Sequence, residues 1–299
     1  MGRFYPYAAA LIPSGGTGFA PVPPKPGCGR RGAGGRNVAV FKFPRTPHLA
    51  GSRLQPGDED LAQVPLSALA GQRVVVCEKL DGANVGVSFG TDGRPRLQSR
   101  GHYLSGGQRE QQFTLFKSWA ATVAPLLWPR LRDRYVCYGE WLYAKHTVFY
   151  DALPHYFCEF DVLDTATGRF LDTAARRDLL AGVPVASAPV LAEQVFTSAR
   201  QVAALVGPST CRTPGWRAAL AHAAADAGVD PAVAAAESDG SDLMEGVYLR
   251  AESGGQVLGR YKWVRAGFAQ AVAESGSHWA DRPIVANRLA DPEALYAGL

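Results

Sequence analysis

The chain has 299 residues, 47% of them hydrophobic, and a formal net charge of +4 at pH 7. That length allows one large domain or two small ones with a substantial core, and the mild charge means that a nucleic-acid surface would have to come from clustered Lys and Arg. No apolar run reaches about 18 residues and no secretory signal pattern opens the chain, so we expect neither a membrane span nor export. Five cysteines without a Cys-x-x-Cys spacing argue against disulfides and zinc and fit a cytoplasmic protein.

Residues 1–36 are rich in Gly and Pro, with a basic run at 30–36. Such a composition cannot bury enough apolar area to offset chain entropy, so we predict a disordered extension. Its basic end could contact nucleic acid, or the segment could be a plain linker or follow from a start codon placed too early. The folded domain is predicted to cover residues 37–299.

From residue 38 on, alternating apolar residues and turn signals predict a series of strands and helices. Helices are expected over 110–127, ending before Pro129, and over 173–181. The Ala-rich segment at about 188–238 is expected to be an insertion of two or three helices without a catalytic part. Together these elements predict an α+β domain of antiparallel sheets with flanking helices. The predicted strands are 73–78, 84–89, 95–99, 135–141, 156–163, 246–250 and 256–264.

The run from residue 74 to 89 places Lys79 and the turn signal Asp81-Gly82 between two apolar segments. A lysine amine that attacks phosphorus must be neutral, whereas a free lysine has a pKa near 10.4. Burial or a nearby cation would lower that pKa, so we expect a lowered pKa for a nucleophilic Lys79. The alternative is an ordinary β-hairpin with a surface lysine.

This run and five later motifs resemble, in order, those of the covalent nucleotidyltransferases, the superfamily of polynucleotide ligases and mRNA capping enzymes. The resemblance covers about residues 41–265. Asn84, two residues beyond the Asp-Gly, is similar to an asparagine of the RNA ligase 2 type, and segments 43–49 and 143–151 resemble bacterial stand-alone members of that group. The later motifs are Leu97-Gln98-Ser99-Arg100-Gly101, Tyr138-Gly139-Glu140-Trp141, Phe157-Cys158-Glu159-Phe160-Asp161, Glu245-Gly246-Val247-Tyr248-Leu249 and Arg260-Tyr261-Lys262.

The resemblance implies a role for each matching residue. Lys79 would be the nucleophile and Lys262 a cation on the α-phosphate, while Asn84 and Arg100 would orient the end being sealed. The carboxylates expected to hold Mg²⁺ or Mn²⁺ are Glu245 and Glu140. The nucleotide-binding set implied in this way is Glu78, Lys79, Arg100, Glu140, Phe160 (stacked on adenine), Glu245, Arg260 and Lys262.

The chain departs from the family where a Lys-x-Lys is usual, because it has Arg260-x-Lys262 with Arg265 three residues later. An arginine can neutralise phosphate but cannot readily shed a proton. Arg260 and Arg265 therefore compete as the second cation. Only residues 266–299 follow the last motif, which is too short for the OB-fold that DNA ligases and capping enzymes append.

The implied function is an ATP-dependent RNA ligase that stores AMP on Lys79, passes it to a 5′-phosphate end and joins that end to a 3′-hydroxyl, as in RNA repair. Its expected partners are RNA ends, including nicked duplexes, and an end-healing kinase or phosphatase. The alternatives are a minimal DNA ligase or a capping-type guanylyltransferase, and more remotely a non-catalytic nucleotide- or nucleic-acid-binding module.

Overall fold

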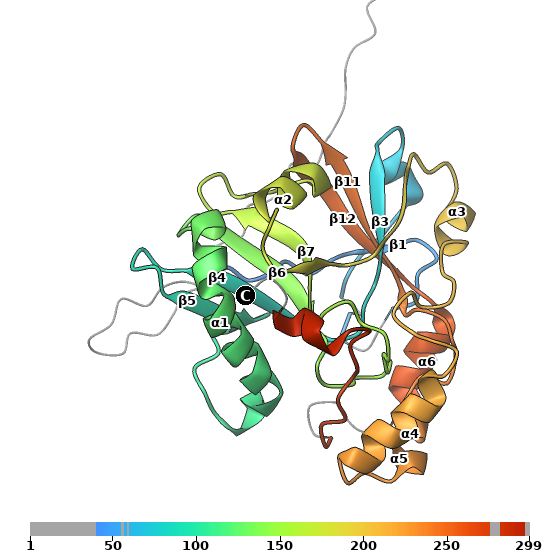
Figure 1. Cartoon of the computed structure of the whole chain (residues 1–299). Helices are drawn as coiled ribbons and strands as arrows, with labels where there is room; N and C mark the ends of the chain where they lie inside the picture. The colour runs from blue at the N-terminus through green and yellow to red at the C-terminus, as the bar shows by residue number, and fades with distance from the viewer. Residues whose placement is uncertain (1–39, 55–56, 59, 276–281, 297–299) are drawn as a thin grey trace, which may run out of the picture.

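A computed structural model of the chain describes residues 40–54, 57–58, 60–275 and 282–296 (Figure 1). The predicted extension at 1–36 and the start of alternation at residue 38 lie outside these residues. The described strands form two sheets of six. The first has the order β10 (Val190–Gln194), β3 (Val74–Glu78), β11 (Gly246–Ser253), β12 (Gln256–Val264), β1 (His48–Leu49) and β2 (Gln63–Val64).

The second sheet stands beside the first and is built around β6 (Tyr135–Trp141) and β7 (Phe157–Asp164). Most pairs in the two sheets are antiparallel, as expected, and β1 pairs in parallel with both β12 and β2. The mixed α+β architecture predicted from the sequence is confirmed. The second sheet has the order β5 (Pro95–Ser99), β4 (Ala83–Phe89), β6, β7 and β8 (Arg169–Phe170), with β9 (Ala186–Ser187) paired in parallel to β7.

The turn after β3 carries the chain from one sheet to the other. β3 pairs with β10 and β11, whereas β4 pairs with β5 and β6. The hairpin alternative for Lys79 is therefore wrong, because the strands on either side of the lysine are not partners. Gly82 is required in this turn, since a Cβ there would lie 2.6 Å from the carbonyl oxygen of Trp141.

Helix α1 (Thr114–Leu131) covers one face of the second sheet (Figure 1). Phe116 and Trp119 of the helix share a buried cluster with Val85 and Val87 of β4. The prediction that this helix ends before Pro129 was wrong, because α1 continues through Pro125 and Pro129. Both prolines lie on its exposed face, where water can hydrate the backbone carbonyl that each proline leaves without an amide partner.

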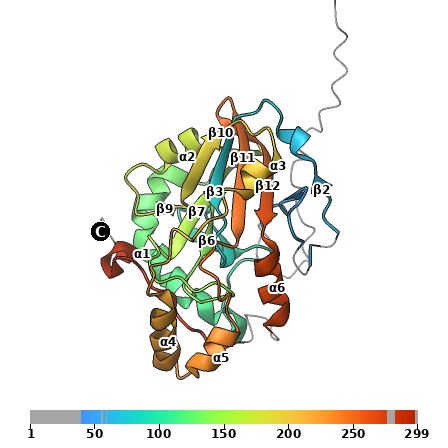
Figure 2. The same ribbon diagram turned by 90° about the vertical axis from the view of Figure 1, so that its right-hand side faces the viewer.

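The segment predicted as a helical insertion contains α3 (Ala199–Ala203), α4 (Trp216–Asp226) and α5 (Pro231–Ala236). It also contains β10, which the sequence analysis missed, paired antiparallel to β3 at the edge of the first sheet. The mostly exposed β10 has no strong alternation of its own, so tertiary pairing decides its structure. Figures 1 and 2 place α4 and α5 together at one end of the molecule, near α6 (Ala266–Glu274). The short helix predicted at 173–181 is α2 (Thr173–Leu179).

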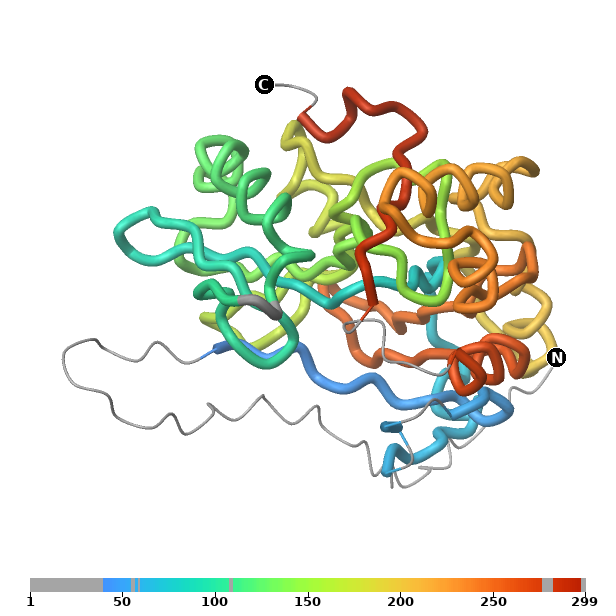
Figure 3. The backbone as a smooth tube through the Cα atoms, turned by 90° about the horizontal axis from the view of Figure 1, so that it is seen from below, coloured from blue at the N-terminus to red at the C-terminus, as the bar shows by residue number. Residues whose placement is uncertain are grey.

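An extended segment, residues 40–54, runs along one side of the molecule (Figure 3). At its start the carbonyl oxygen of Phe41 accepts hydrogen bonds from Gln98 and Tyr138 of the second sheet. Further on, the carbonyl of Pro47 accepts the amide of Lys262 in the first sheet. The segment therefore connects the two sheets. No helix in the described ranges is long and apolar enough to cross a bilayer.

We predict that Gly246→Ala lowers the free energy of unfolding by about 1–3 kcal/mol, as overpacking typically does. The new Cβ would lie 2.1 Å from the carbonyl oxygen of Trp263 on β12, so the two strands would have to separate. Urea denaturation measures the effect. Gly207→Ala is the control, because nothing lies within 4 Å of its Cβ position; equal stabilities for the two variants would contradict the prediction.

Candidate active site

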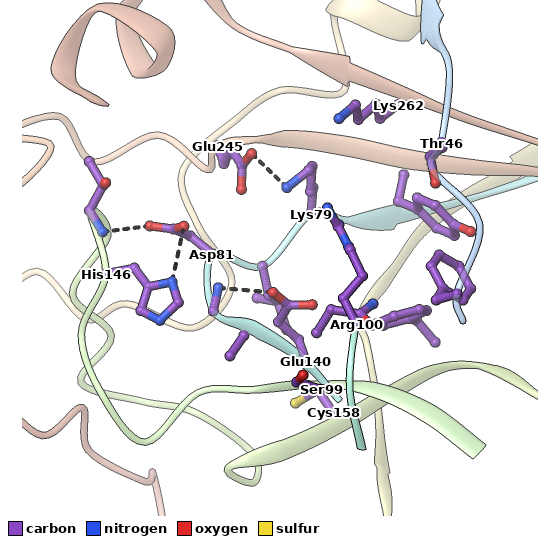
Figure 4. A pocket seen from close by; sticks show the side chains of 18 of the residues that line it. Thr46, Lys79, Asp81, Ser99, Arg100, Glu140, His146, Cys158, Glu245 and Lys262 are labelled. Carbon is purple, nitrogen blue, oxygen red and sulfur yellow. Dashed lines mark hydrogen bonds and ion pairs between the residues drawn. The ribbon is translucent and has the colours of Figure 1, made fainter. Parts of the chain in front are cut away.

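A cavity of about 1410 Å³ is lined by residues from both sheets and from the extended segment. Lys79, directly after β3, lies where the walls meet. Lys262 of β12 and Glu245 before β11 lie on the first-sheet side, and Glu140 of β6 and Arg100 after β5 on the second-sheet side (Figure 4). The cavity thus brings together residues that lie far apart in the sequence.

Lys79 and Glu245 form an ion pair, with 2.6 Å between Nζ and Oε1. The β3–β11 ladder positions both residues, since the Lys79 amide donates to the carbonyl of Gly246 at 3.0 Å. The lysine side chain is 24% exposed and the glutamate side chain 1%. The amine therefore reaches into the cavity while its partner carboxylate is buried in the wall.

The expectation of a lowered pKa for Lys79 is wrong for the site without bound nucleotide. Burial lowers the pKa of this amine, but the charge of Glu245, followed by Glu140 and Asp81, outweighs burial and the net direction is upward. Lys79 is therefore held as an ammonium. An attack by this amine requires a change in the charges around it.

Glu140 faces the same amine from the second sheet. Its Oε1 accepts the amide of Gly82 at 3.2 Å, which joins β6 to the turn that carries Lys79. Burial raises the pKa of Glu140 to about 7 against the opposing effect of Lys79 and Arg100, and burial likewise raises the pKa of Glu245 to about 7. The two carboxyl groups can therefore change protonation near neutral pH.

Asp81 fixes the loop that follows β6. Its Oδ2 accepts the amides of Thr147 and Val148, both at 2.7 Å, and its own amide donates to the hydroxyl of Tyr150 at 2.8 Å. His146 lies on the same loop beside the carboxylate (Figure 4). The Asp-Gly turn therefore organises the cavity wall as well as reversing the chain.

Lys262 lines the cavity but is bound by Asp58, which the sequence analysis did not identify. The same carboxylate accepts Arg45 Nη2 at 3.1 Å and contacts His48 Nε2 at 3.2 Å. Burial opposes ionisation of Asp58, yet the hydrogen bonds from His48 and Lys262 hold its pKa well below its usual range. Burial and the nearby Lys79 lower the pKa of Lys262. Asp58 is thus an anion held in the cavity by basic groups.

Neither candidate for the second cation lines the cavity. Arg260 Nη1 lies 3.9 Å from Asp161 Oδ2, and its guanidinium stacks over the ring of Phe170 at 3.7 Å. Arg265 donates to the carbonyl of Met244 at 2.8 Å and forms an ion pair with Asp239. Arg45, which was not predicted for this role, lines the cavity and binds the same carboxylate as Lys262, as His48 also does.

Glu78 borders the cavity, but its carboxylate accepts hydrogen bonds from Ser209 and Thr210 at 2.5–2.9 Å. Its side chain is therefore engaged in holding the segment after α3. Phe160 also lines the cavity, within an aromatic group in which its ring centroid lies 5.2 Å from that of Phe43 and 5.9 Å from that of Tyr248. This group offers flat apolar surface for a base.

No group of three or more His, Cys, Asp or Glu side chains is arranged as a metal site in the described part of the chain. Mg²⁺, however, is often held by one or two carboxylates together with substrate phosphates. Glu245 and Glu140 both line the cavity beside Lys79. These two residues therefore fit a metal ion that is coordinated by the protein and a bound nucleotide together, and do not fit one coordinated by protein side chains alone.

A family model described as RNA ligase matches residues 72–264. The chain belongs to the RNA ligase family. The match spans the predicted site from Glu78 to Lys262. Asp58, which binds Lys262, and Arg45, which binds Asp58, lie before the matched range. A comparison with curated proteins found no match.

Solved structures of Naegleria gruberi RNA ligase are similar to this RNA ligase family member at 16% identity. A mutant with ATP and Mn gives a TM-score of 0.48 and covers 77% of this chain and 58% of that one. A second mutant with ATP and Mn gives 0.49, with 79% and 59% covered, and the ligase with PPi gives 0.45, with 77% and 59% covered. The present chain thus spans less than two thirds of the length of these chains.

For this RNA ligase family member we predict that Lys79→Ala makes stability more dependent on pH. Without the ammonium, the pKa values of Glu245 and Glu140 rise above about 7. The folded state then binds more protons than the unfolded state around neutral pH, so stability increases as the pH falls. When the pH is lowered from 8.5 to 6.5, the melting temperature of Lys79→Ala should rise more than that of the unsubstituted protein. The extra rise should be about 2–4 °C for each kcal/mol of added stability.

The control for this prediction is Lys117→Ala. This substitution removes another lysine–carboxylate pair, in which Lys117 Nζ lies 2.5 Å from Glu110 Oε2. The pKa of Glu110 is lowered, so this carboxyl group does not titrate between pH 6.5 and 8.5. Parallel melting curves for Lys79→Ala and the unsubstituted protein would contradict the assignment of Lys79 as the cation that balances the two glutamates.

Proposed function

We propose that the chain is an ATP-dependent RNA ligase of the RNA ligase 2 type that works through a covalent lysyl-AMP. The observation that carries the proposal is the position of Lys79 in a cavity with Glu245, Glu140 and Lys262, in a chain of the RNA ligase family. Covalent storage of AMP on an amine divides one difficult joining reaction into easier steps.

In the first step Lys79 Nζ attacks the α-phosphorus of ATP. A P–N bond forms, the bond from phosphorus to the bridging oxygen breaks, and pyrophosphate leaves. The amine must lose its proton, and the carboxylate of Glu245, with Oε1 2.6 Å from Nζ, is placed to accept it. With a pKa raised to about 7, the Glu245 carboxylate is a better proton acceptor than an ordinary glutamate.

The surrounding residues bind and orient the nucleotide. Lys262 neutralises charge on the α-phosphate, and the aromatic group containing Phe160 receives the adenine. Glu140 binds ribose hydroxyls. Mg²⁺ or Mn²⁺ held by Glu245, Glu140 and the phosphates would supply positive charge that favours the neutral amine and stabilises the developing negative charge.

The second and third steps transfer AMP to a 5′-phosphate end and join that end to a 3′-hydroxyl. In the transfer, a 5′-phosphate oxygen attacks the lysyl-bound phosphorus and the P–N bond breaks. In the joining step the 3′-hydroxyl attacks the capped 5′-phosphorus, and AMP leaves. Arg100 and Asn84, which line the second-sheet side of the cavity, orient the end being sealed.

The proposal predicts that the purified chain, incubated with Mg²⁺ and α-labelled ATP, retains label through denaturing electrophoresis and loses it on addition of pyrophosphate. Lys79→Ala should abolish labelling, because it removes the attacking amine. Lys42→Ala, an exposed lysine outside the cavity lining, is the matched control and should label normally.

The same assay separates the other functions. Labelling by GTP alone would indicate a capping-type guanylyltransferase instead of a ligase. Efficient sealing of an all-DNA nick would indicate a DNA ligase. Absence of label from folded protein with either nucleotide would contradict the proposal and favour a binding module.

A further prediction concerns Asp58, whose carboxylate forms an ion pair with Lys262. Triphosphate and Asp58 compete for the same cation, so Asp58→Ala should lower the KM for ATP in lysyl-AMP formation by about tenfold, as for a charge-assisted hydrogen bond. Asp60→Ala is the control, since Asp60 binds Arg45 at 2.7 Å but does not line the cavity. A higher KM for Asp58→Ala than for Asp60→Ala would show instead that Asp58 helps to bind the nucleotide.

A further inference from the structure

A row of arginines leads away from the cavity along β5, the strand at the outer edge of the second sheet (Figure 1). Arg96 lies within β5, and Arg94 and Arg100 directly flank the strand. Residues two or four positions apart in a strand lie on one face, so these three form one row. Arg100 lines the cavity, whereas Arg94 and Arg96 do not. The chain from Arg94 to Arg100 covers roughly 20 Å at the rise of a strand, so the row extends beyond the space that a nucleotide at Lys79 would fill.

At the outer end of this row, the turn between β4 and β5 packs against Trp128 of α1. The ring centroids of Trp128 and Phe89 are 5.5 Å apart, and a Cβ on Gly93 would lie 3.5 Å from the Trp128 ring. The guanidinium carbon of Arg132 lies over the same ring, 5.3 Å from its centroid. Trp128 therefore places Arg132, at the end of α1, on the same end of the sheet as Arg94.

Arg132 has an unusual backbone conformation for an arginine. It follows α1 with φ 48° and ψ −156°, and it is the one non-glycine residue with a positive φ in the described ranges. A side chain is sterically unfavourable in this conformation, and glycine usually takes such a place after a helix. The amide of Arg132 donates to the carbonyl of Trp128 at 3.0 Å, but that bond needs no side chain. The steric cost therefore points to a role for the guanidinium itself.

The charges of this surface are available to a partner. Arg94 is 87% exposed, and its contact with Asp92 is long, at 3.7 Å, so this exposed pair contributes little. Arg132 is exposed and forms no ion pair with a carboxylate in the described part of the chain, whereas the nearby Arg134 is bound by Asp164 at 2.6 and 2.9 Å. The charged side chains from the β4–β5 turn, β5 and the end of α1 are Arg94, Arg96, Arg130 and Arg132 against Asp92 and Asp133.

A row of arginines that begins at the cavity fits a polyanion whose end lies in the cavity. The guanidinium is a planar fork of donors suited to phosphate oxygens, and phosphate contacts position a nucleic acid without reading its sequence. We propose that Arg94 and Arg132 bind backbone phosphates of the RNA arm that leads away from the end being sealed. At ~3.4 Å per nucleotide along the arm, the contacted phosphates lie about six nucleotides from that end. This inference rests on the proposed ligase function.

The test measures binding of a nicked RNA duplex to the full chain by fluorescence anisotropy at several salt concentrations. The double variant Arg94→Ala/Arg132→Ala should raise the Kd about three- to tenfold, as for two exposed ion pairs. It should also reduce the slope of log affinity against log salt by about 1.4–1.8, as for two lost phosphate contacts. Labelling by ATP, in which no RNA takes part, reports whether the variant is folded. The control is Arg169→Ala/Arg177→Ala, which removes the same charge from β8, at the opposite edge of the sheet, and from α2; its Kd should match that of the unsubstituted protein.

Arg132→Gly separates a binding role from a structural one, because glycine accepts the backbone conformation of this position. This variant should weaken RNA binding without lowering the melting temperature. A lower melting temperature with an unchanged affinity for RNA would show that Arg132 only stabilises the end of α1, and would overturn the inference.

Duplexes with methylphosphonate linkages, which carry no charge, locate the contact. Neutral linkages about six nucleotides from the nick should weaken binding to the unsubstituted protein and have no further effect on Arg94→Ala/Arg132→Ala, because both changes remove the same contact. Additive losses, or equal Kd values for the double variant and its control, would overturn this inference alone. A chain that never forms lysyl-AMP overturns the proposed function, and with it the assignment of the bound RNA as a substrate arm.

Discussion

The ion pair between Lys79 and Glu245 is the interaction on which the site depends. It joins the end of β3 to the start of β11, at the point where the chain leaves the first sheet for the second. The backbone ladder sets its geometry, because Lys79 donates its amide to Gly246, the residue after Glu245. The register of β3 and β11 therefore places the backbones of Lys79 and Glu245 side by side, and the lysine side chain then reaches the carboxylate.

The buried charges of the cavity compensate one another. Lys79 balances Glu245 and Glu140, while Lys262 shares Asp58 with Arg45 and His48. Removing one partner from such a group leaves another buried charge unpaired, which is more costly than the pair itself is stabilising. Under the proposed function, a triphosphate brings negative charge that can take the place of Asp58 on Lys262. The resting site then holds its cations in position with carboxylates until the substrate arrives.

The sequence predicted the parts of the fold and site that depend on local pattern. Alternating apolar residues located β3, β4, β6, β7, β11 and β12, and the lysine and carboxylates of the motifs do meet in one cavity. The parts that it missed depend on long-range contacts. β10 is a strand because β3 lies beside it, and Asp58 has an ordinary loop sequence whose partner Lys262 is 204 residues away. The direction of the Lys79 pKa shift could not be predicted either, because it is decided by how close Glu245 and Glu140 come.

The most direct test of the account is to locate the nucleotide on the chain. After incubation with ATP and Mg²⁺, proteolysis and mass spectrometry would identify which residue carries AMP. We predict a single AMP on the peptide that contains Lys79, bound through nitrogen and lost on treatment with pyrophosphate. AMP on another lysine or on a histidine, with Lys79 unmodified, would contradict the assignment of Lys79 as the nucleophile.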